Sequence, residues 1–232
     1  MKKTYSLFEP NARGFKSLFA GILFALLFSS VSFSQIKVSD DIPQYLFNRF
    51  TDGLVVKKSG EKVVAELNYN IATQEMIFKQ DGRFLALGNL NSIDTVYLNN
   101  MVFIPYDNMF LEFAVSGKID LLVQFSGTAR VKGEDVGYGV SSETSRVTSM
   151  TSISNGGALY NMDLPDNIEI TRNITYYVRQ GEEMERFVNE RAFSRLFRDK
   201  KKKIRNYIKD NNLDFDNYSD VVQVVTWLNG EL

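Results

Sequence analysis

The chain of 232 residues contains no cysteine and no histidine. Without cysteine it can form no disulfide, offers no thiolate nucleophile and cannot carry a bacterial lipid anchor on cysteine. Without histidine it lacks the Ser-His-Asp and Cys-His catalytic arrangements and histidine metal ligands. Structural zinc sites of the usual kinds need one or both of these residues, so they are excluded as well.

An excess of charge of either sign is also missing, because 27 Lys and Arg residues stand against 28 Asp and Glu residues. A nucleic-acid-binding protein would carry a large basic excess, so nucleic acid is not an expected partner. The sequence has no G-x-S-x-G motif, no P-loop and no calcium loop with its fixed spacing of oxygen ligands. We therefore predict a protein that is not an enzyme, with no catalytic, cofactor-binding or metal-binding residues and no cofactor.

Residues 1–34 have the order of a secretory signal peptide. Four basic residues within the first sixteen precede an uncharged apolar run at 17–34, which ends in small residues at positions 32 and 34. An uncleaved membrane anchor is the alternative, but four serines in the last third of the run argue against a spanning helix. We expect cleavage before Gln35 and export to the periplasm or cell envelope, or to the extracellular space. No transmembrane segment is expected after cleavage.

Residues 35–180 indicate an antiparallel β domain. Short runs of alternating apolar residues are divided by tight-turn pairs, namely Asp81-Gly82, Asn99-Asn100, Ser116-Gly117 and Ser126-Gly127. About ten strands with connections of two to six residues permit antiparallel neighbours but no parallel crossovers. We predict a mainly β fold, an antiparallel β-meander that forms a curled sheet, a half-barrel or a sandwich. Runs such as VVAEL are apolar on both faces, so each face is expected to contact a helix, another wall of sheet or a ligand.

Residues 181–232 indicate a C-terminal helical segment packed on the β domain. From Glu182 the apolar residues follow a helical period, in a helix that is continuous or only briefly broken at Arg198-Asp199. Asn217 or Ser219 can cap a last helix, in which apolar residues repeat at i, i+3, i+4 and i+7 from Val221. We predict two or three short amphipathic helices.

Two segments are candidates for contact with a partner or ligand. Tyr138 lies in a predicted loop at 137–144, which precedes a polar strand at 146–153 with the character of a protected edge or a partner-facing rim. The second segment is the basic run of Lys200, Lys201, Lys202, Lys203 and Arg205. It could bind lipid headgroups, lipopolysaccharide or an acidic partner. A solvated face of an amphipathic helix is the simpler interpretation, because nearby aspartates dilute the charge.

Three carboxylates on predicted strands, Glu66, Asp94 and Glu112, could meet across a sheet. A glycoside hydrolase needs two such groups about 5 to 10 Å apart across a cleft. The simpler expectation is that each one is a solvent-facing strand residue.

Several runs resemble a recurrent type of exported, β-rich protein of Gram-negative bacterial envelopes. They are GEKVVAELNYN, TQEMIFK, IDTVYL, MVFIP, GYGVSSETS and FSRLFRDKKKKIRNYIKDNNLDF. The resemblance implies export and brings no named activity, ligand or catalytic residue. A looser, purely architectural likeness is to half-barrel periplasmic lipoprotein carriers of the LolA/LolB type, whose concave face holds acyl chains.

Four functions remain open at this point. The first is an exported, non-enzymatic envelope protein that binds an envelope protein, a lipid or a glycan through its β scaffold. The alternatives are a structural or assembly component acting through its C-terminal helices, a carrier of hydrophobic ligands or lipoproteins, and a carboxylate-based enzyme acting on glycans. A carrier needs an open apolar groove, an enzyme needs two facing carboxylates, and an assembly component needs an apolar patch beside the helices.

Overall fold

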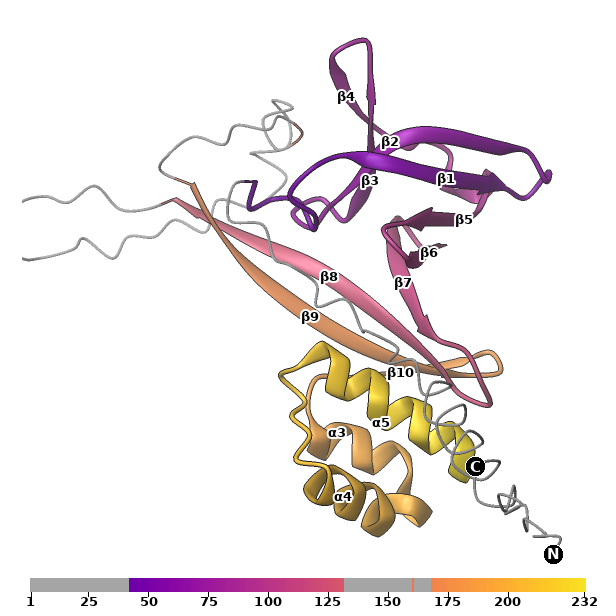
Figure 1. Ribbon diagram of the computed structural model, residues 1–232, viewed down its shortest axis with the longest axis vertical. Coiled ribbons are helices and arrows are strands. Elements are labelled where there is room, and N and C mark those ends of the chain that lie inside the picture. Colours follow the sequence, from indigo (N-terminus) through magenta and orange to yellow (C-terminus); the bar gives the residue numbers. More distant parts are fainter. Residues whose placement is uncertain (1–41, 132–159, 161–167) are drawn as a thin grey trace, which may run out of the picture. The chain divides into compact units, whose positions relative to one another are not determined.

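A computed structural model describes residues 42–131, 160 and 168–232. Within these residues the strands form one antiparallel sheet in the order β10-β9-β8-β7-β6-β5-β1-β2-β3-β4 (Figure 1). The strands are β1 Thr51–Lys57, β2 Lys62–Asn70, β3 Glu75–Gln80, β4 Arg83–Ala86, β5 Ile93–Leu98, β6 Met101–Tyr106, β7 Met109–Val115, β8 Asp120–Val131, β9 Ile168–Gln180 and β10 Glu183–Phe187. The predicted fold class, a curled antiparallel β-meander with C-terminal helices, is confirmed. The described sheet is open, since β10 and β4 lie at its two ends.

Two of the predicted turns have the backbone that their sequence favours. Asp81 and Gly82 have φ values of 51° and 73°, and Asn99 and Asn100 have φ values of 49° and 64°. Positive φ at both central residues is the requirement of a tight two-residue hairpin, and Asp, Asn and Gly meet it with little steric cost. These pairs join β3 to β4 and β5 to β6.

The sheet departs from a simple meander at one connection. The strands β1 to β4 follow one another, but β5 then pairs with β1 on the side opposite β2. The connection from β4 to β5 contains only a short 3-10 helix, η1 Leu90–Ser92. So short a link can join two strands that have three others between them only if the sheet bends sharply.

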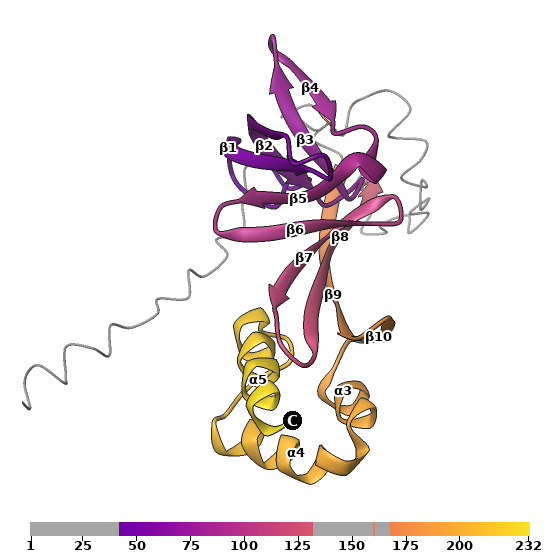
Figure 2. The ribbon, with the colours of Figure 1, turned by 90° about the vertical axis from the view of Figure 1, so that its right-hand side faces the viewer.

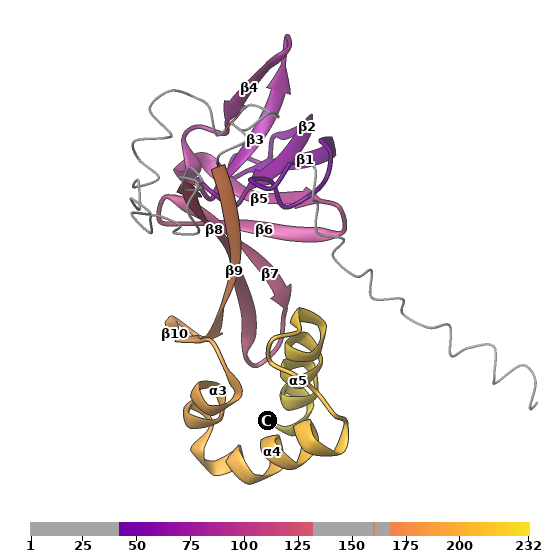
Figure 3. The same cartoon turned by 90° about the vertical axis from the view of Figure 1, so that its left-hand side faces the viewer.

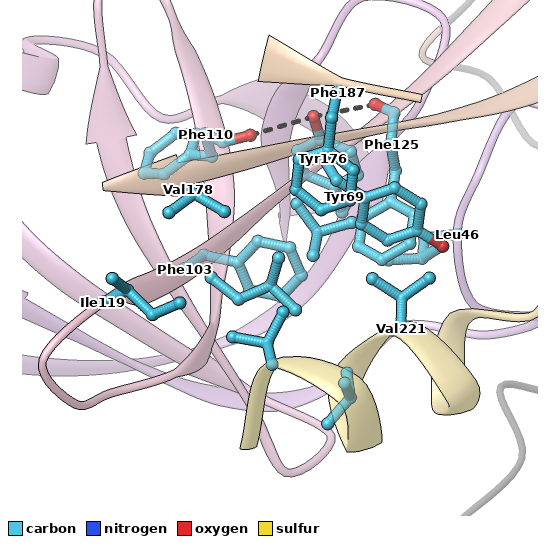
Figure 4. Close-up of a cluster of buried hydrophobic side chains, with 14 of the residues drawn as sticks. Leu46, Tyr69, Phe103, Phe110, Ile119, Phe125, Tyr176, Val178, Phe187 and Val221 are labelled. Carbon is cyan, nitrogen blue, oxygen red and sulfur yellow. Dashed lines mark hydrogen bonds between the residues drawn. The ribbon is translucent and has the colours of Figure 1, made fainter. Parts of the chain in front are cut away.

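A set of contacts that we call the seam holds this bend. The hydroxyl of Tyr69, on β2, lies 3.1 Å from the carbonyl oxygens of Phe110 on β7 and Phe125 on β8. In the adjoining turn, the Ile71 carbonyl accepts a hydrogen bond of 2.7 Å from the Gly127 backbone N–H on β8. Burial raises the pKa of the Tyr69 hydroxyl, so the hydroxyl remains a donor. The seam therefore folds the β2 end of the sheet back onto β7 and β8 (Figure 4).

Gly127 lies inside β8 and not in the turn that Ser126-Gly127 predicted. The two expected strands on either side of this pair form one strand of 12 residues. A Cβ at residue 127 would lie 2.9 Å from Cγ2 of Ile170 and 3.1 Å from Cγ1 of Ile71. Glycine is thus required here because the side chains of Ile71 and Ile170 approach the backbone too closely for a Cβ.

The C-terminal segment contains three α-helices within the described residues. They are α3 Glu190–Leu196, α4 Lys201–Asp210 and α5 Tyr218–Glu231, with a 3-10 helix η2 Arg198–Lys200 between the first two. Of the two alternatives for this region, a continuous helix or one broken at Arg198-Asp199, the structure has the broken one. Of the two candidate caps, Asn217 caps α5, and its side chain accepts a hydrogen bond from the Ser219 N–H. The helices lie together beside the ends of β7 and β10 (Figures 2 and 3).

The helical period predicted from Glu182 is wrong for the first residues of this segment. Residues Glu183–Phe187 form β10, which pairs with the end of β9 after a turn at Gly181 with φ of 64°. The Phe187 ring stacks on Tyr176 of β9, with centroids 5.3 Å apart. Pairing and stacking with β9 override a local pattern that also suits a helix.

Helix α5 covers one face of the sheet, which we call the inner face. Val221, Val224, Val225 and Leu228 are buried against sheet residues that include Phe103 and Phe125. At the far end of α5, the Asn229 side chain donates to the Ile119 carbonyl and accepts from the Ile119 N–H, both at 2.9 Å. This end contact and the apolar stripe together fix the helix across β7 and β8.

From the close contacts in the seam we expect valine substitutions at two glycines to differ in their effect on stability. Gly127→Val should lower the free energy of unfolding by about 1–3 kcal/mol, because the new side chain cannot fit between Ile71 and Ile170. Gly88→Val is the control, since no atom lies within 4 Å of a Cβ at that position. Urea unfolding of both variants measures the effect. Equal stability of the two variants would contradict the close approach at Gly127.

Candidate functional site

A row of directly paired residues crosses the inner face of the sheet. In strand order it runs Val55, Val96, Phe103, Glu112, Val123, Tyr176 and Phe187. All seven side chains are buried, and Glu112 is the one ionisable carboxyl among them. The expectation that Glu112 faces solvent is therefore wrong, whereas Glu66 and Asp94 are exposed as expected.

Glu112 is held by one hydrogen bond from the first residue of α5. The Tyr218 hydroxyl donates to Oε1 of Glu112 at 2.6 Å, and the glutamate residue is only 3% exposed. Its other carboxyl oxygen, Oε2, is buried and has no hydrogen-bond partner among the described residues. Burial raises the pKa of Glu112 to about 7, and the Tyr218 bond opposes this rise.

The groups around Glu112 do not make an acid/base couple. Burial and the nearby Glu112 carboxyl raise the pKa of both Tyr176 and Tyr218, so these phenols stay neutral. Glu66 lies on the opposite face of the sheet, because its neighbours Leu67 and Tyr69 point inward. A two-carboxylate mechanism needs both groups at one cleft, and Glu112 and Glu66, on opposite faces of the sheet, do not meet this requirement.

The opposite, outer face carries a second row. Val64 pairs with Leu54, Leu54 with Tyr97 and Tyr97 with Val102, so the four side chains share one face across β2, β1, β5 and β6. Val64 is 68% exposed and Tyr97 is 47% exposed. We call these four residues the outer apolar face. No described helix or second sheet covers it.

Two shallow hollows adjoin the outer apolar face and share Tyr97 and Val102. One, of about 430 Å³, includes all four residues of the face together with Asp52 and Asn99. The other, of about 480 Å³, includes Lys58, Phe113 and Arg179. The Arg179 guanidinium lies 5.4 Å from the centre of the Phe113 ring and forms a 2.9 Å ion pair with Asp120. Both hollows are open to solvent, and both are lined by apolar residues together with polar or charged ones.

The VVAEL run is the sequence signal for this face. The VVAEL run on β2 is apolar at consecutive positions, and consecutive strand residues point to opposite faces. Both faces were therefore expected to meet an apolar neighbour. The structure provides a cover for the inner face only.

The predicted basic residues lie on η2 and α4. Lys201, Lys202, Lys203 and Arg205 are exposed and Lys200 is half-buried, while Ile204 and Ile208 point into the helical core. The second predicted contact residue, Tyr138, lies outside the described residues, as do the predicted loop at 137–144, the polar strand at 146–153 and the predicted signal peptide.

Other kinds of site receive little support from the described part of the chain. No group of three or more Asp or Glu residues there could hold a metal ion. No helix in that part has both the length and the apolar character needed to cross a membrane. Comparisons with protein-family models, curated proteins and solved structures found no match to the chain.

The buried carboxyl predicts a pH dependence. The folded pKa of Glu112, about 7, lies above its ordinary value of 4.5, so the folded protein holds a proton that the unfolded chain releases between these values. The stability from this carboxyl is fully present below pH 4.5 and is lost as the pH rises through 7, by on the order of 3 kcal/mol.

Glu112→Gln isolates this effect, because glutamine stays neutral and still accepts from Tyr218. At pH 5 the variant and the unmodified protein should unfold at similar urea concentrations. At pH 8 the variant should be the more stable of the two. A stability difference that does not change between pH 5 and pH 8 would show that Glu112 titrates normally.

The Tyr218 hydroxyl predicts a loss of stability when it is removed. Tyr218→Phe should lower the free energy of unfolding by about 1–3 kcal/mol, because Glu112 would keep no described donor. The loss should be larger at pH 8 than at pH 5, since the ionised carboxylate needs the donor most. Tyr207→Phe is the control, as its hydroxyl makes one exposed contact of 3.3 Å with Gln223 and its removal should cost less than about 0.5 kcal/mol.

Proposed function

We propose that the protein is an exported, non-enzymatic binding protein of the cell envelope, and that a partner protein docks on its outer apolar face. Export rests on the basic, apolar and small-residue order of residues 1–34. Docking rests on one observation: four apolar side chains lie in a directly paired, uncovered row across four strands.

Exposed apolar residues are common as single residues, and a contiguous group is less so. Val64 is 68% exposed, so its side chain buries little apolar surface on folding and contributes little to the stability of the folded state. Tyr97 adds a large, rigid side chain with a polar tip, a type that is enriched where proteins bind each other. The two hollows combine apolar residues with polar and charged ones, and protein interfaces likewise combine apolar and polar groups.

The shape of the hollows favours a partner protein over an acyl chain. Pockets for small apolar ligands are concave and bury most of the ligand surface. The two hollows on the outer apolar face are open, so an acyl chain bound there would remain largely in water. A carrier of hydrophobic ligands is accordingly the less favoured function.

An enzyme acting on glycans is also less favoured. The one described carboxyl with a raised pKa is Glu112, and it lies on the inner face, buried by the contact with α5. The outer hollows contain one carboxylate each, Asp52 in the first and Asp94 in the second. Neither hollow thus offers the pair of carboxyls that glycoside hydrolysis uses.

Photo-crosslinking in the producing cells tests this function. A photoreactive phenylalanine analogue at position 97 should give one discrete crosslinked protein in the envelope fraction. The same analogue at Val188 is the matched control, because Val188 is 48% exposed and Tyr97 is 47% exposed. Val64→Lys, on the same face, should abolish the product at position 97. The absence of a product, or equal products at positions 97 and 188, would reject the outer apolar face as a docking site.

The mass of the purified chain tests export separately. Cleavage before Gln35 should yield a chain that starts at that residue and is recovered outside the cytoplasm. An intact N-terminus in a cytoplasmic fraction would overturn the export half of the proposal.

A further inference from the structure

The segment 198–210 concentrates positive charge. It holds seven basic residues and two acidic ones, while the whole chain has 27 basic and 28 acidic residues. The rest of the chain is therefore net acidic, and the protein is electrically asymmetric. Such asymmetry orients a protein in the field of a charged partner.

Most of these basic side chains form no ion pair within the described chain, and Arg198, Lys201 and Lys202 lie together among them. Lys200 donates to the carbonyl of Glu231 at 2.6 Å, and Lys203 forms an ion pair of 2.9 Å with its carboxylate. Arg205 lies 3.7 Å from the Glu190 carboxylate. By contrast, no ion pair or hydrogen bond joins the side chains of Arg198, Lys201 and Lys202 to another described residue. All three are exposed.

The charges are placed where the helix itself disfavours them. Helices α3 and α5 each begin with an asparagine cap and an acidic residue in the first turn. Helix α4 begins at Lys201 with no side-chain cap and no acid in its first turn. The N-terminal end of a helix carries partial positive charge, so lysines there reduce stability in the isolated protein. An anion bound at this position would offset both the helix dipole and the lysine charges.

The same residues line a hollow of about 350 Å³. Its cationic side chains come from Arg198, Lys201, Lys202 and Arg205, and the remaining lining residues are Asp199 and Asn206. We call this hollow and the exposed side of α4 the basic surface. Helix α4 packs against α3 and α5, and it lies on the side of the three helices that faces away from β7 and β10 (Figures 2 and 3). The basic surface is therefore accessible to a broad, flat partner.

We propose that the basic surface docks on an anionic membrane, with lipid phosphate groups held by Arg198, Lys201 and Lys202. A membrane suits this surface better than an acidic protein does, because stable protein interfaces depend on buried aromatic or apolar anchors. No large apolar residue of η2 or α4 is exposed. The rings of Tyr207 on α4 and Trp227 on α5 stack on each other, with centroids 4.2 Å apart. Attraction by clustered Lys and Arg alone is the mode by which polybasic segments bind anionic lipid surfaces.

Vesicle sedimentation tests this proposal with the purified chain. Vesicles of phosphatidylcholine alone are compared with vesicles that also contain phosphatidylglycerol, at low and at high salt. The protein should bind the anionic vesicles more strongly, and salt should remove the difference. Should residues 1–34 still be attached, their four basic residues would add a preference for anionic vesicles, so the comparison between variants of the same chain is the measured quantity.

Lys201→Gln combined with Lys202→Gln should weaken binding to anionic vesicles about 30-fold. Lys62→Gln with Lys79→Gln is the matched control, since both lysines are exposed on β2 and β3 and their loss removes the same charge. The control should bind as the unmodified protein does. A charge reversal, Lys201→Glu with Lys202→Glu, should abolish binding to anionic vesicles and leave a folded protein, because acids suit a helix N-terminus.

Three results would overturn the proposal. They are equal binding to both vesicle types, equal loss in the two glutamine pairs, and binding to soluble polyglutamate with no binding to anionic vesicles. The last result would indicate an acidic protein partner. Since the vesicles contain no protein and the outer apolar face is unchanged in these variants, failure here leaves the docking function at Tyr97 untouched.

Discussion

The buried hydroxyl of Tyr69 joins parts of the sheet that the strand order keeps apart. Tyr69 lies on β2, and its hydrogen-bond acceptors are backbone carbonyls on β7 and β8. Its ring stacks on Phe103 of the intervening strand β6, with centroids 5.4 Å apart. A buried phenol without a partner would be costly, so the bend that brings both carbonyls within reach satisfies the hydroxyl and curls the sheet together. The short connection before β5 and the absence of a side chain at Gly127 both depend on this bend.

The bend makes the two faces of the sheet unequal. On its inner side the paired row is enclosed by α5, which is why Glu112 is dehydrated and its pKa is raised. The outer side has no cover among the described residues, and so Val64 and Tyr97 remain in water. Each face thus holds a residue type that local stability alone would not select, a carboxyl inside and an apolar row outside. The inner carboxyl accepts a hydrogen bond from Tyr218, whereas no described helix covers the outer row, and this difference supports our proposal that a partner docks on the outer face.

In the helices, too, the residues that stabilise the fold differ from those exposed on the surface. Their apolar side chains hold them on the sheet, and Ile204 and Ile208 hold α4 within the group. Lys201 and Lys202, at the start of α4, form no ion pair with another described residue and oppose the helix dipole. The basic surface and the outer apolar face belong to different elements, so a membrane and a protein could be bound together without competing for the same residues.

The sequence by itself determined the elements whose causes are local. Asp81-Gly82 and Asn99-Asn100 have the left-handed backbone that their side chains tolerate, and Asn217 caps α5 through its own side chain. Alternation predicted most strands, and the helical period predicted the C-terminal helices. Only the tertiary structure decided Gly127, β10 and Glu112. The sequence around Gly127 is typical of a turn, and only the contacts with Ile71 and Ile170 explain why a glycine stands inside a strand. The sequence of β10 is also compatible with a helix, and its pairing with β9 makes it a strand. Because strands apolar on both faces do not reveal which face a helix will cover, the burial of Glu112 and the exposure of Tyr97 followed from where α5 docked.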